Sequence, residues 1–320
     1  ATDEGRLRLS ATNLELGISC WIPAQIEEEG AITVPARTFS DYVNTLSGER
    51  VQLTANMQTQ SLNVRSAAST SDIKGIDANE YPPMPAPDLA NGVTFKAGEL
   101  KEMIQQVAFA ASTDEARPVL QGVMVSLRDG ELTLAATDGF RISVRRAPLA
   151  ASLAKPLEMI VPARALTELA RIAADPEAEI RLHIPSGRGQ AIFRLKDAEL
   201  VTQLIEGNFP DYRAIIPRAL KTHTILTTAA LLAACKQAEI IAREGNNVIR
   251  VDVRGRGQEP GVVEISAQSE ETGNSEVQLD ANIDGPDLTI AFNVRYLREV
   301  LDVIKTPSVA LETIAHNAPA

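Results

Sequence analysis

The sequence predicts an α+β protein made of three copies of one domain, each copy containing two similar halves in the order strand, helix, three strands. Three observations lead to this class. Related segments end at Arg37, Arg164 and Arg295, which lie 127 and 131 residues apart. Apolar and polar residues alternate between turn signals, as they do in antiparallel strands. Each predicted helix carries a single apolar stripe.

Length and composition are those of a multidomain globular chain. The 320 residues are 44% hydrophobic and 23% charged, and no apolar run reaches the length of a membrane span. Cys20 and Cys235 lie far apart, which indicates a reducing compartment, so we expect a cytoplasmic protein without disulfides. The net charge of −11 argues against a broadly basic nucleic-acid binder, although local basic faces stay open. An aromatic content of 4% argues against a stacking platform for single strands.

The repeats predict where one copy ends and the next begins. A proline-rich stretch at 82–87 reads as a stiff linker, and 215–218 joins the second copy to the third. The expected domains are 1–88, 93–215 and 218–320. The first copy lacks its opening strand and helix and the third lacks its closing strands, so we expect the chain to be a fragment at both ends.

The second copy shows the pattern most fully. We expect a strand at 93–95, a helix at 98–112, a meander of antiparallel strands within 117–146, a strand at 159–161, a helix at 163–174 and strands between 180 and 201. In the meander, Val123, Val125 and Leu127 alternate with Met124, Ser126 and Arg128 up to the tight turn Asp129-Gly130.

A second turn, Thr137-Asp138-Gly139, has unusual neighbours. Phe140 and Ile142 are expected on one face of the following strand and Arg141 on the other. An aromatic, an arginine and a β-branched residue stand here where a turn usually has only small polar residues around it. The pattern fits either an ordinary meander corner or a ligand site, and spacing alone leaves both open.

The three related helices each begin with an arginine opposite the apolar stripe. Arg37, Arg164 and Arg295 sit in the first turn, where the helix dipole disfavours a positive charge by a few tenths of a kcal/mol. Shared ancestry of the repeats and contact with phosphates are both adequate explanations. Further cations lie on or near these faces or on the helix that opens the third copy: Arg171, Lys236, Arg243, Arg298 and Lys305.

Signals of enzyme chemistry are weak. His183, His223 and His316 stand alone, so we expect no metal site, and no glycine-rich loop offers a phosphate cradle or cofactor site. Asp138 is the one carboxylate that invites a catalytic interpretation, and it has no evident partner.

Four segments together resemble the β subunit of bacterial DNA polymerase III, the sliding clamp family, over the whole length of the chain. They are Arg117-Pro118 with Leu120 and Gly122, Ala136–Arg141, Leu204–Tyr212 and Phe292–Leu297. The resemblance implies a ring of two chains joined head to tail, with helices lining the hole and antiparallel sheets outside. The resemblance also implies that the cations on the helices face double-stranded DNA and contact it without sequence preference.

The resemblance also implies a pocket for short linear peptides of the polymerase III alpha subunit, the clamp loader, other polymerases and repair proteins. Its residues here are Arg117, Leu120, Thr137, Gly139, Phe140, Arg141, Ile142, Pro210, Ile215, Asn293 and Tyr296. The family's dimer contact falls on Ile240, Ile241 and Tyr42, and the small polar residues at 66–71 put its usual charge pairing in doubt. Ile240 also projects off its own helix stripe, which is typical of an interface.

Two rival functions come from other classes of protein. One is an enzyme that uses Asp138 with a partner not evident in the sequence. The other is a non-replicative α/β scaffold with the same repeat. The resemblance favours the clamp, a non-catalytic subunit of a DNA-directed DNA polymerase.

Overall fold

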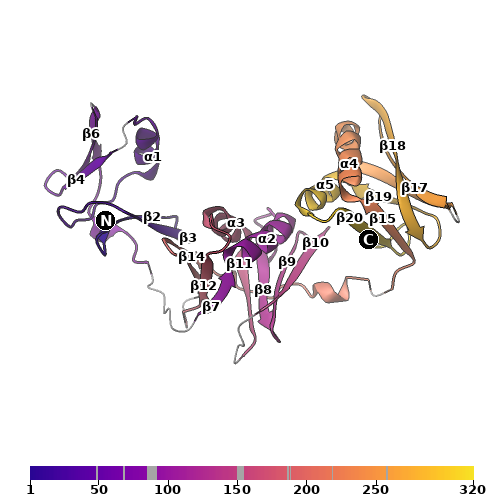
Figure 1. Cartoon of the computed structure of the whole chain (residues 1–320), viewed down its shortest axis with the longest axis horizontal. Coiled ribbons are helices and arrows are strands. Elements are labelled where there is room, and N and C mark those ends of the chain that lie inside the picture. Colours follow the sequence, from indigo (N-terminus) through magenta and orange to yellow (C-terminus); the bar gives the residue numbers. More distant parts are fainter. Residues whose placement is uncertain are drawn as a thin grey trace. The chain divides into compact units, whose positions relative to one another are not determined.

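The computed structural model describes residues 1–47, 50–67, 69–84, 92–149, 155–185, 187, 189–217, 219–256 and 259–320 (Figure 1). The fold is α+β, as predicted. The α-helices are α1 (Ala36–Asn44), α2 (Ala97–Val107), α3 (Ala163–Ile172), α4 (Thr228–Ala242) and α5 (Val294–Val303). None of the helices in the described part of the chain combines the length and apolar character that a bilayer crossing needs.

The strands in the described part of the chain form four sheets. The first has the order β1 (Thr2–Asp3), β2 (Arg6–Thr12), β3 (Leu16–Ile22), β14 (Ala198–Gln203), β13 (Gln190–Arg194), β12 (Glu179–His183), β7 (Val93–Lys96). The second has the order β10 (Ile142–Pro148), β9 (Glu131–Thr137), β8 (Gly122–Arg128), β11 (Leu157–Pro162). The third has the order β19 (Leu288–Asn293), β16 (Val248–Arg256), β17 (Glu259–Ser269), β18 (Gly273–Asp284), β15 (Thr222–Thr227), β20 (Ser308–Thr313), and the fourth the order β4 (Gln52–Asn56), β5 (Ser61–Ser66), β6 (Ser69–Lys74).

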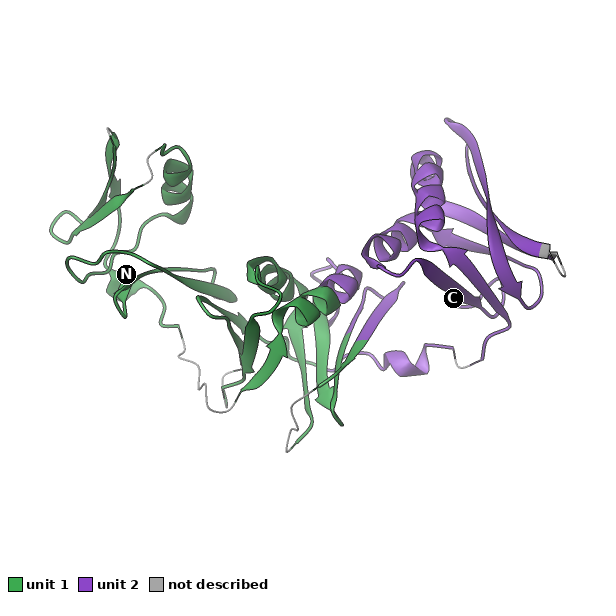
Figure 2. Ribbon diagram, in the orientation of Figure 1, with its two compact units in different colours: residues 1–104, 122–134, 146–207 green, residues 105–121, 135–145, 208–320 purple. Residues whose placement is uncertain are grey.

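The chain divides into two compact units (Figure 2). Unit 1 comprises residues 1–104, 122–134 and 146–207, and unit 2 comprises 105–121, 135–145 and 208–320. Unit 2 therefore contains a short piece of the second copy, around the Thr137 turn, together with the third copy.

The predicted order of elements is present in the second and third copies. The second copy runs β7-α2-β8-β9-β10 and then β11-α3-β12-β13-β14, and the third runs β15-α4-β16-β17-β18 and then β19-α5-β20. The tight turn Asp129-Gly130 has φ angles of +53° and +75°, as a two-residue hairpin turn requires.

Three details differ from the expectations. The helix expected at 98–112 ends as an α-helix at Val107 and continues as one 3-10 turn, Ala108–Ala110. The segment before α1, which corresponds in the repeat to the strands before α3 and α5, forms only a single bridge, Thr33 to Ile76. The alternation in β8 does not separate a buried face from an exposed one, because every residue from Gly122 to Leu127 is buried, so both faces of the sheet are covered here.

One sheet joins the first copy to the second. β3 pairs antiparallel with β14, from Cys20 opposite Ala198 to Leu16 opposite Thr202. Backbone hydrogen bonds therefore link the two copies directly. Of the linker predicted at 82–87, residues 82–84 are described and residues 85–87 lie outside the described residues.

The apolar stripes face the cores as predicted. Helix α4 buries Leu231, Cys235, Ala238 and Ala242 in the core of the third copy, while Ile240 is 65% exposed. The stripe of α3 is buried in the same way, and Phe39 and Tyr42 of α1 pack partly buried on the small cluster of the first copy. Burial raises the pKa of the Cys235 thiol to about 11, with a smaller contribution from the negative charge of Glu239.

Candidate functional site

Thr137 closes the turn at the end of β9. Its hydroxyl donates to the Arg141 carbonyl at 2.7 Å and accepts from the Gly139 amide at 3.0 Å. The side chain is 4% exposed. Because one hydroxyl ties together both ends of the turn, the backbone from 137 to 141 has a fixed conformation.

Asp138 caps the same turn from the other side. One carboxylate oxygen accepts from the Phe140 amide at 2.9 Å and the Arg141 amide at 3.0 Å, and the other accepts from Arg141 Nε at 3.1 Å. Both oxygens are thus engaged in the turn. This is the arrangement of an Asx turn, so Asp138 has a structural role in shaping the corner.

Arg141 connects the turn to helix α5. Its guanidinium pairs with Glu299, donates to the Phe109 carbonyl at 3.0 Å and lies over the Tyr296 ring at 4.4 Å from the centroid. Its side chain is only 17% exposed. The expectation that Phe140 and Arg141 lie on opposite faces of a strand is wrong, because β10 begins only at Ile142.

Phe140 is instead the exposed part of the corner. It is 79% exposed, on a bend whose backbone is fixed by Thr137 and Asp138. Ile215, on the segment that leads into the third copy, is 54% exposed. Leu120, Ile142 and Pro210 are half-buried. The corner therefore presents apolar side chains from a rigid backbone.

Gly139 and Arg117 lie close together at this corner. Gly139 has a φ of +93°, and a Cβ there would lie 3.2 Å from Arg117 Nη1, so a larger residue would meet both backbone strain and crowding. Arg117 Nε is 3.0 Å from a carboxylate oxygen of Asp114. The pKa of the Asp114 carboxyl is lowered mainly by the hydrogen bond from the Ala116 amide and next by the hydrogen bond from Arg117.

Asn293 and Tyr296 are also engaged in the structure of α5. The Asn293 side chain caps the helix by accepting from the Arg295 amide at 3.0 Å, and Tyr296 forms the stack with Arg141. All eleven predicted pocket residues belong to unit 2. Two pairs among them lie close together: Arg141 stacks on Tyr296, and the space beside Gly139 is occupied by the Arg117 guanidinium.

Sequence reasoning missed Glu299 and Phe109, which hold Arg141 in place. The signal for Glu299 was its spacing: it follows Tyr296 by three residues and so shares that residue's helix face. Phe109 contributes a backbone carbonyl, for which the sequence carries no signal.

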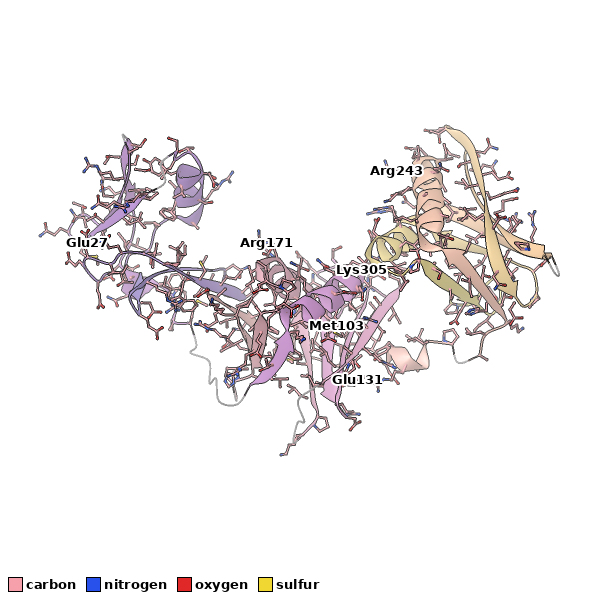
Figure 3. All side chains as sticks on the ribbon, viewed as in Figure 1. Glu27, Met103, Glu131, Arg171, Arg243 and Lys305 are labelled. Carbon is pink, nitrogen blue, oxygen red and sulfur yellow. The ribbon has the colours of Figure 1, made fainter. Side chains whose placement is uncertain are left out.

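The first-turn arginines are exposed in all three copies. Arg37 is 95% exposed on its side chain and lies 3.8 Å from Asp41, and Arg164 and Arg295 are also exposed. Arg171 is paired at 2.7 Å with Glu168 but keeps 75% of its side chain exposed. Figure 3 labels Arg171 on α3, Arg243 in the 3-10 turn that follows α4 and Lys305 just beyond the end of α5.

Two of the predicted DNA-facing cations are held by carboxylates between α4 and α5. Arg298 lies 2.9 Å from Glu239, which is buried, and 3.0 Å from Asp302. Lys236 lies 3.1 Å from Asp302. These ion pairs hold the two helices together. The nearby carboxylates also reduce the positive electrostatic potential that Lys236 and Arg298 present to solvent.

The residues predicted at the dimer contact differ in exposure. Ile240 is exposed, whereas Ile241 packs partly against the third-copy core and Tyr42 against Leu62, Val64 and Ile73. Within the described residues, no cluster of three or more metal-binding side chains occurs.

Known proteins resemble the chain along its whole length. Family models of the DNA polymerase III beta subunit match in order: the N-terminal domain at residues 1–85, the central domain at 94–211 and the C-terminal domain at 213–320. The beta sliding clamp of Staphylococcus epidermidis is 32% identical over 326 aligned positions, covering 99% of this chain and 84% of that protein. The chain belongs to the DNA polymerase III beta subunit family.

Solved structures agree with this assignment. The DNA polymerase sliding clamp of Bacillus subtilis matches with a TM-score of 0.89 at 28% identity, covering 99% of this chain and 84% of that one. That of Pseudomonas aeruginosa matches with a TM-score of 0.87 at 25% identity and the same coverage. This beta clamp therefore has the three-domain clamp fold, and its function is that of a DNA sliding clamp, as the resemblance in the sequence implied.

Proposed function

We propose that this beta clamp acts without catalysis, holding partner proteins on DNA through short peptides that bind at the Thr137–Arg141 corner. The observation that carries the proposal is the exposure of Phe140, 79%, on a backbone fixed by the hydrogen bonds of Thr137 and Asp138. An apolar side chain on a rigid corner is suited to a hydrophobic peptide anchor, because little conformational entropy is lost on binding.

The structure supports a division of roles among the pocket residues. Phe140, Ile215 and Leu120 supply apolar contact area, while Arg141 and Asn293 hold the corner and α5 in shape through their internal hydrogen bonds. Arg117 keeps about half of its side chain exposed and is the cation best placed to meet a ligand.

Titration calorimetry with a pentapeptide ending in Leu-Phe tests this proposal. We expect micromolar affinity, roughly −7 to −8 kcal/mol. Leu120→Asp should abolish binding by placing a charge among apolar contacts. Ile225→Asp, a change at an exposed apolar position on β15, is the matched control and should bind normally. Binding that survives Leu120→Asp, or an equal loss in both variants, contradicts the site.

For DNA, we propose that Arg37, Arg164, Arg171, Arg295, Arg243 and Lys305 face the duplex. The repeated first-turn position and its exposure support the three arginines of α1, α3 and α5. Lys236 and Arg298 contribute less than the sequence predicted, because Asp302 and Glu239 neutralise them. Contacts of this kind carry no sequence information and let the protein slide.

For assembly, we propose a homodimer whose contact centres on Ile240, with Ile241 beside it. Tyr42 is the weakest member of the proposed contact, because its side chain packs inside the first copy. Ile240→Asp should give monomers in analytical ultracentrifugation of full-length protein, whereas Ile225→Asp should not. An unchanged dimer constant would place the contact elsewhere.

We further propose the domain division 1–88, 93–215 and 218–320, which the ranges of the three family models support. The proposed partners are the polymerase III alpha subunit, the clamp loader, other polymerases and repair proteins, in the cytoplasm. The rival non-replicative scaffold predicts no topological link to DNA. Retention on nicked circular DNA with loss on linearisation supports the clamp, and equal retention on both supports the scaffold.

A further inference from the structure

The corner between β2 and β3 repeats the hydrogen bonds of the Thr137 corner. The Thr12 hydroxyl donates to the Leu16 carbonyl at 3.0 Å and accepts from the Leu14 amide at 3.0 Å. Asn13 takes the place of Asp138, since its side-chain oxygen accepts from the Glu15 amide at 3.1 Å and the Leu16 amide at 2.8 Å. The first copy therefore has the same rigid turn as the second.

Leu14 occupies the position of Gly139 in this first corner. Its φ is +75°, a left-handed conformation that a branched-chain residue adopts at a cost of about 1 to 2 kcal/mol. Its side chain is nevertheless 70% exposed, so burial does not compensate for the strain. Strain of this kind, in a turn held by its own hydrogen bonds, points to a functional position.

A cavity of about 180 Å³ opens beside this corner, with lining residues that include Thr12, Leu14, Met84, Gln190 and Gln203. Its size is close to the roughly 150 Å³ of an engineered protein cavity that holds benzene, so it fits one apolar side chain. Met84 forms one wall and packs closely on β3. A Cβ on Gly17 would lie only 2.8 Å from the Met84 methyl carbon, and the Ser19 hydroxyl donates a hydrogen bond to the Met84 sulfur at 3.6 Å.

The polar lining residues suit a peptide backbone and a positive charge. Gln190 and Gln203 lie opposite each other in the β13–β14 pair, so two side-chain amides stand together, each with donors and an acceptor. Glu15 is the one charged residue among those lining the cavity, and it is exposed. A ligand with a cation next to its apolar group is therefore favoured over one with an anion.

We propose that the Thr12–Leu16 corner is a second peptide site, which takes a short extended segment carrying a basic residue beside an apolar one. The apolar side chain enters the cavity, the peptide backbone meets Gln190 and Gln203, and the basic group lies near Glu15. Every lining residue belongs to unit 1, whereas the Thr137 corner belongs to unit 2. The two sites can therefore be tested separately.

Methionine-methyl NMR of the full chain reports on this site. The chain has five methionines, of which Met84 lines the cavity and Met57 is an exposed reference on another turn. The probe is the acetylated and amidated peptide Ala-Gln-Lys-Leu-Phe, titrated into Leu120→Asp protein so that the Thr137 corner does not respond. We expect a saturable shift of Met84 alone. The same peptide with Glu in place of Lys should bind about five- to tenfold more weakly.

Two variants complete the test. Leu14→Asp should abolish the Met84 shift without harming the fold, because Asp tolerates a left-handed φ better than Leu. Glu15→Gln should remove most of the difference between the Lys and Glu peptides. A silent Met84 at millimolar peptide, or a shift unchanged in Leu14→Asp, overturns the proposal. Binding at the Thr137 corner, measured separately in Leu14→Asp protein, is unaffected by either result.

Discussion

Replacing Arg141 with alanine is the sharpest test of how the corner is held. The change removes a hydrogen bond to Asp138, an ion pair with Glu299, a hydrogen bond to the Phe109 carbonyl and the stack on Tyr296. Hydrogen bonds to charged groups contribute about 1.5–3 kcal/mol each, and a cation–π contact about 0.5–2 kcal/mol. Since Glu299 and Asp138 regain some water in the variant, we expect a net loss of about 2–4 kcal/mol in the stability of the corner against α5.

Hydrogen exchange measured by mass spectrometry on peptides covering 294–303 gives the readout. A loss of 2–4 kcal/mol corresponds to roughly 30- to 1000-fold faster exchange of the α5 amides, if α5 opens as a unit. Arg141→Lys keeps the positive charge but loses the planar guanidinium. Its α5 amides should therefore exchange at rates between those of Arg141→Ala and the wild type. Arg146→Ala is the matched control, because Arg146 on the adjoining strand β10 makes only a 3.7 Å pair with Glu131 and both side chains are about half exposed. Equal α5 protection in Arg141→Ala and Arg146→Ala would refute this account of the corner.

Three further predictions concern other parts of the molecule. Burial raises the pKa of Glu199 against the opposing charge of Arg194, so the protonated carboxyl stabilises the fold in acid and this contribution is lost as pH rises. The difference in unfolding free energy between wild type and Glu199→Gln should therefore fall as pH rises above the ordinary glutamate range in denaturant titrations. With its pKa raised to about 11, the buried Cys235 should resist iodoacetamide at pH 8 in native protein, and mass spectrometry should find its alkylation only after denaturation. Replacing Arg164 and Arg295 together with alanine should lower the salt slope of DNA binding by about 2, and an unchanged slope in filter-binding titrations would remove them from the DNA face.

Much of the fold follows from local patterns in the sequence. The recurrence of the segments ending at Arg37, Arg164 and Arg295 predicted repeated copies, and the stripe of α4 predicted which of its residues are buried. The turn at Asp129-Gly130 was predictable because glycine and aspartate favour the positive φ that a tight hairpin needs. These features depend on residues close together in the chain.

The details of the candidate site were harder to predict, because they depend on contacts between distant residues. The sequence placed Arg141 in the pocket but gave no sign that Glu299, 158 positions away, and the Phe109 carbonyl hold its guanidinium. Strand periodicity placed Phe140 inside a strand, but the hydrogen bonds of Thr137 and Asp138 keep it in the bend. The cavity at the Thr12 corner has the same origin, since Met84 and Gln190 reach it from separate parts of the chain.

The pairing of β3 with β14 has a mechanical consequence. Its register joins five residue pairs, from Cys20 opposite Ala198 to Leu16 opposite Thr202, between the first and second copies. A pull along these strands loads the ladder in shear, so its hydrogen bonds share the load and must fail together rather than one after another. Tension between the two copies is then borne by the sheet as well as by the covalent linker.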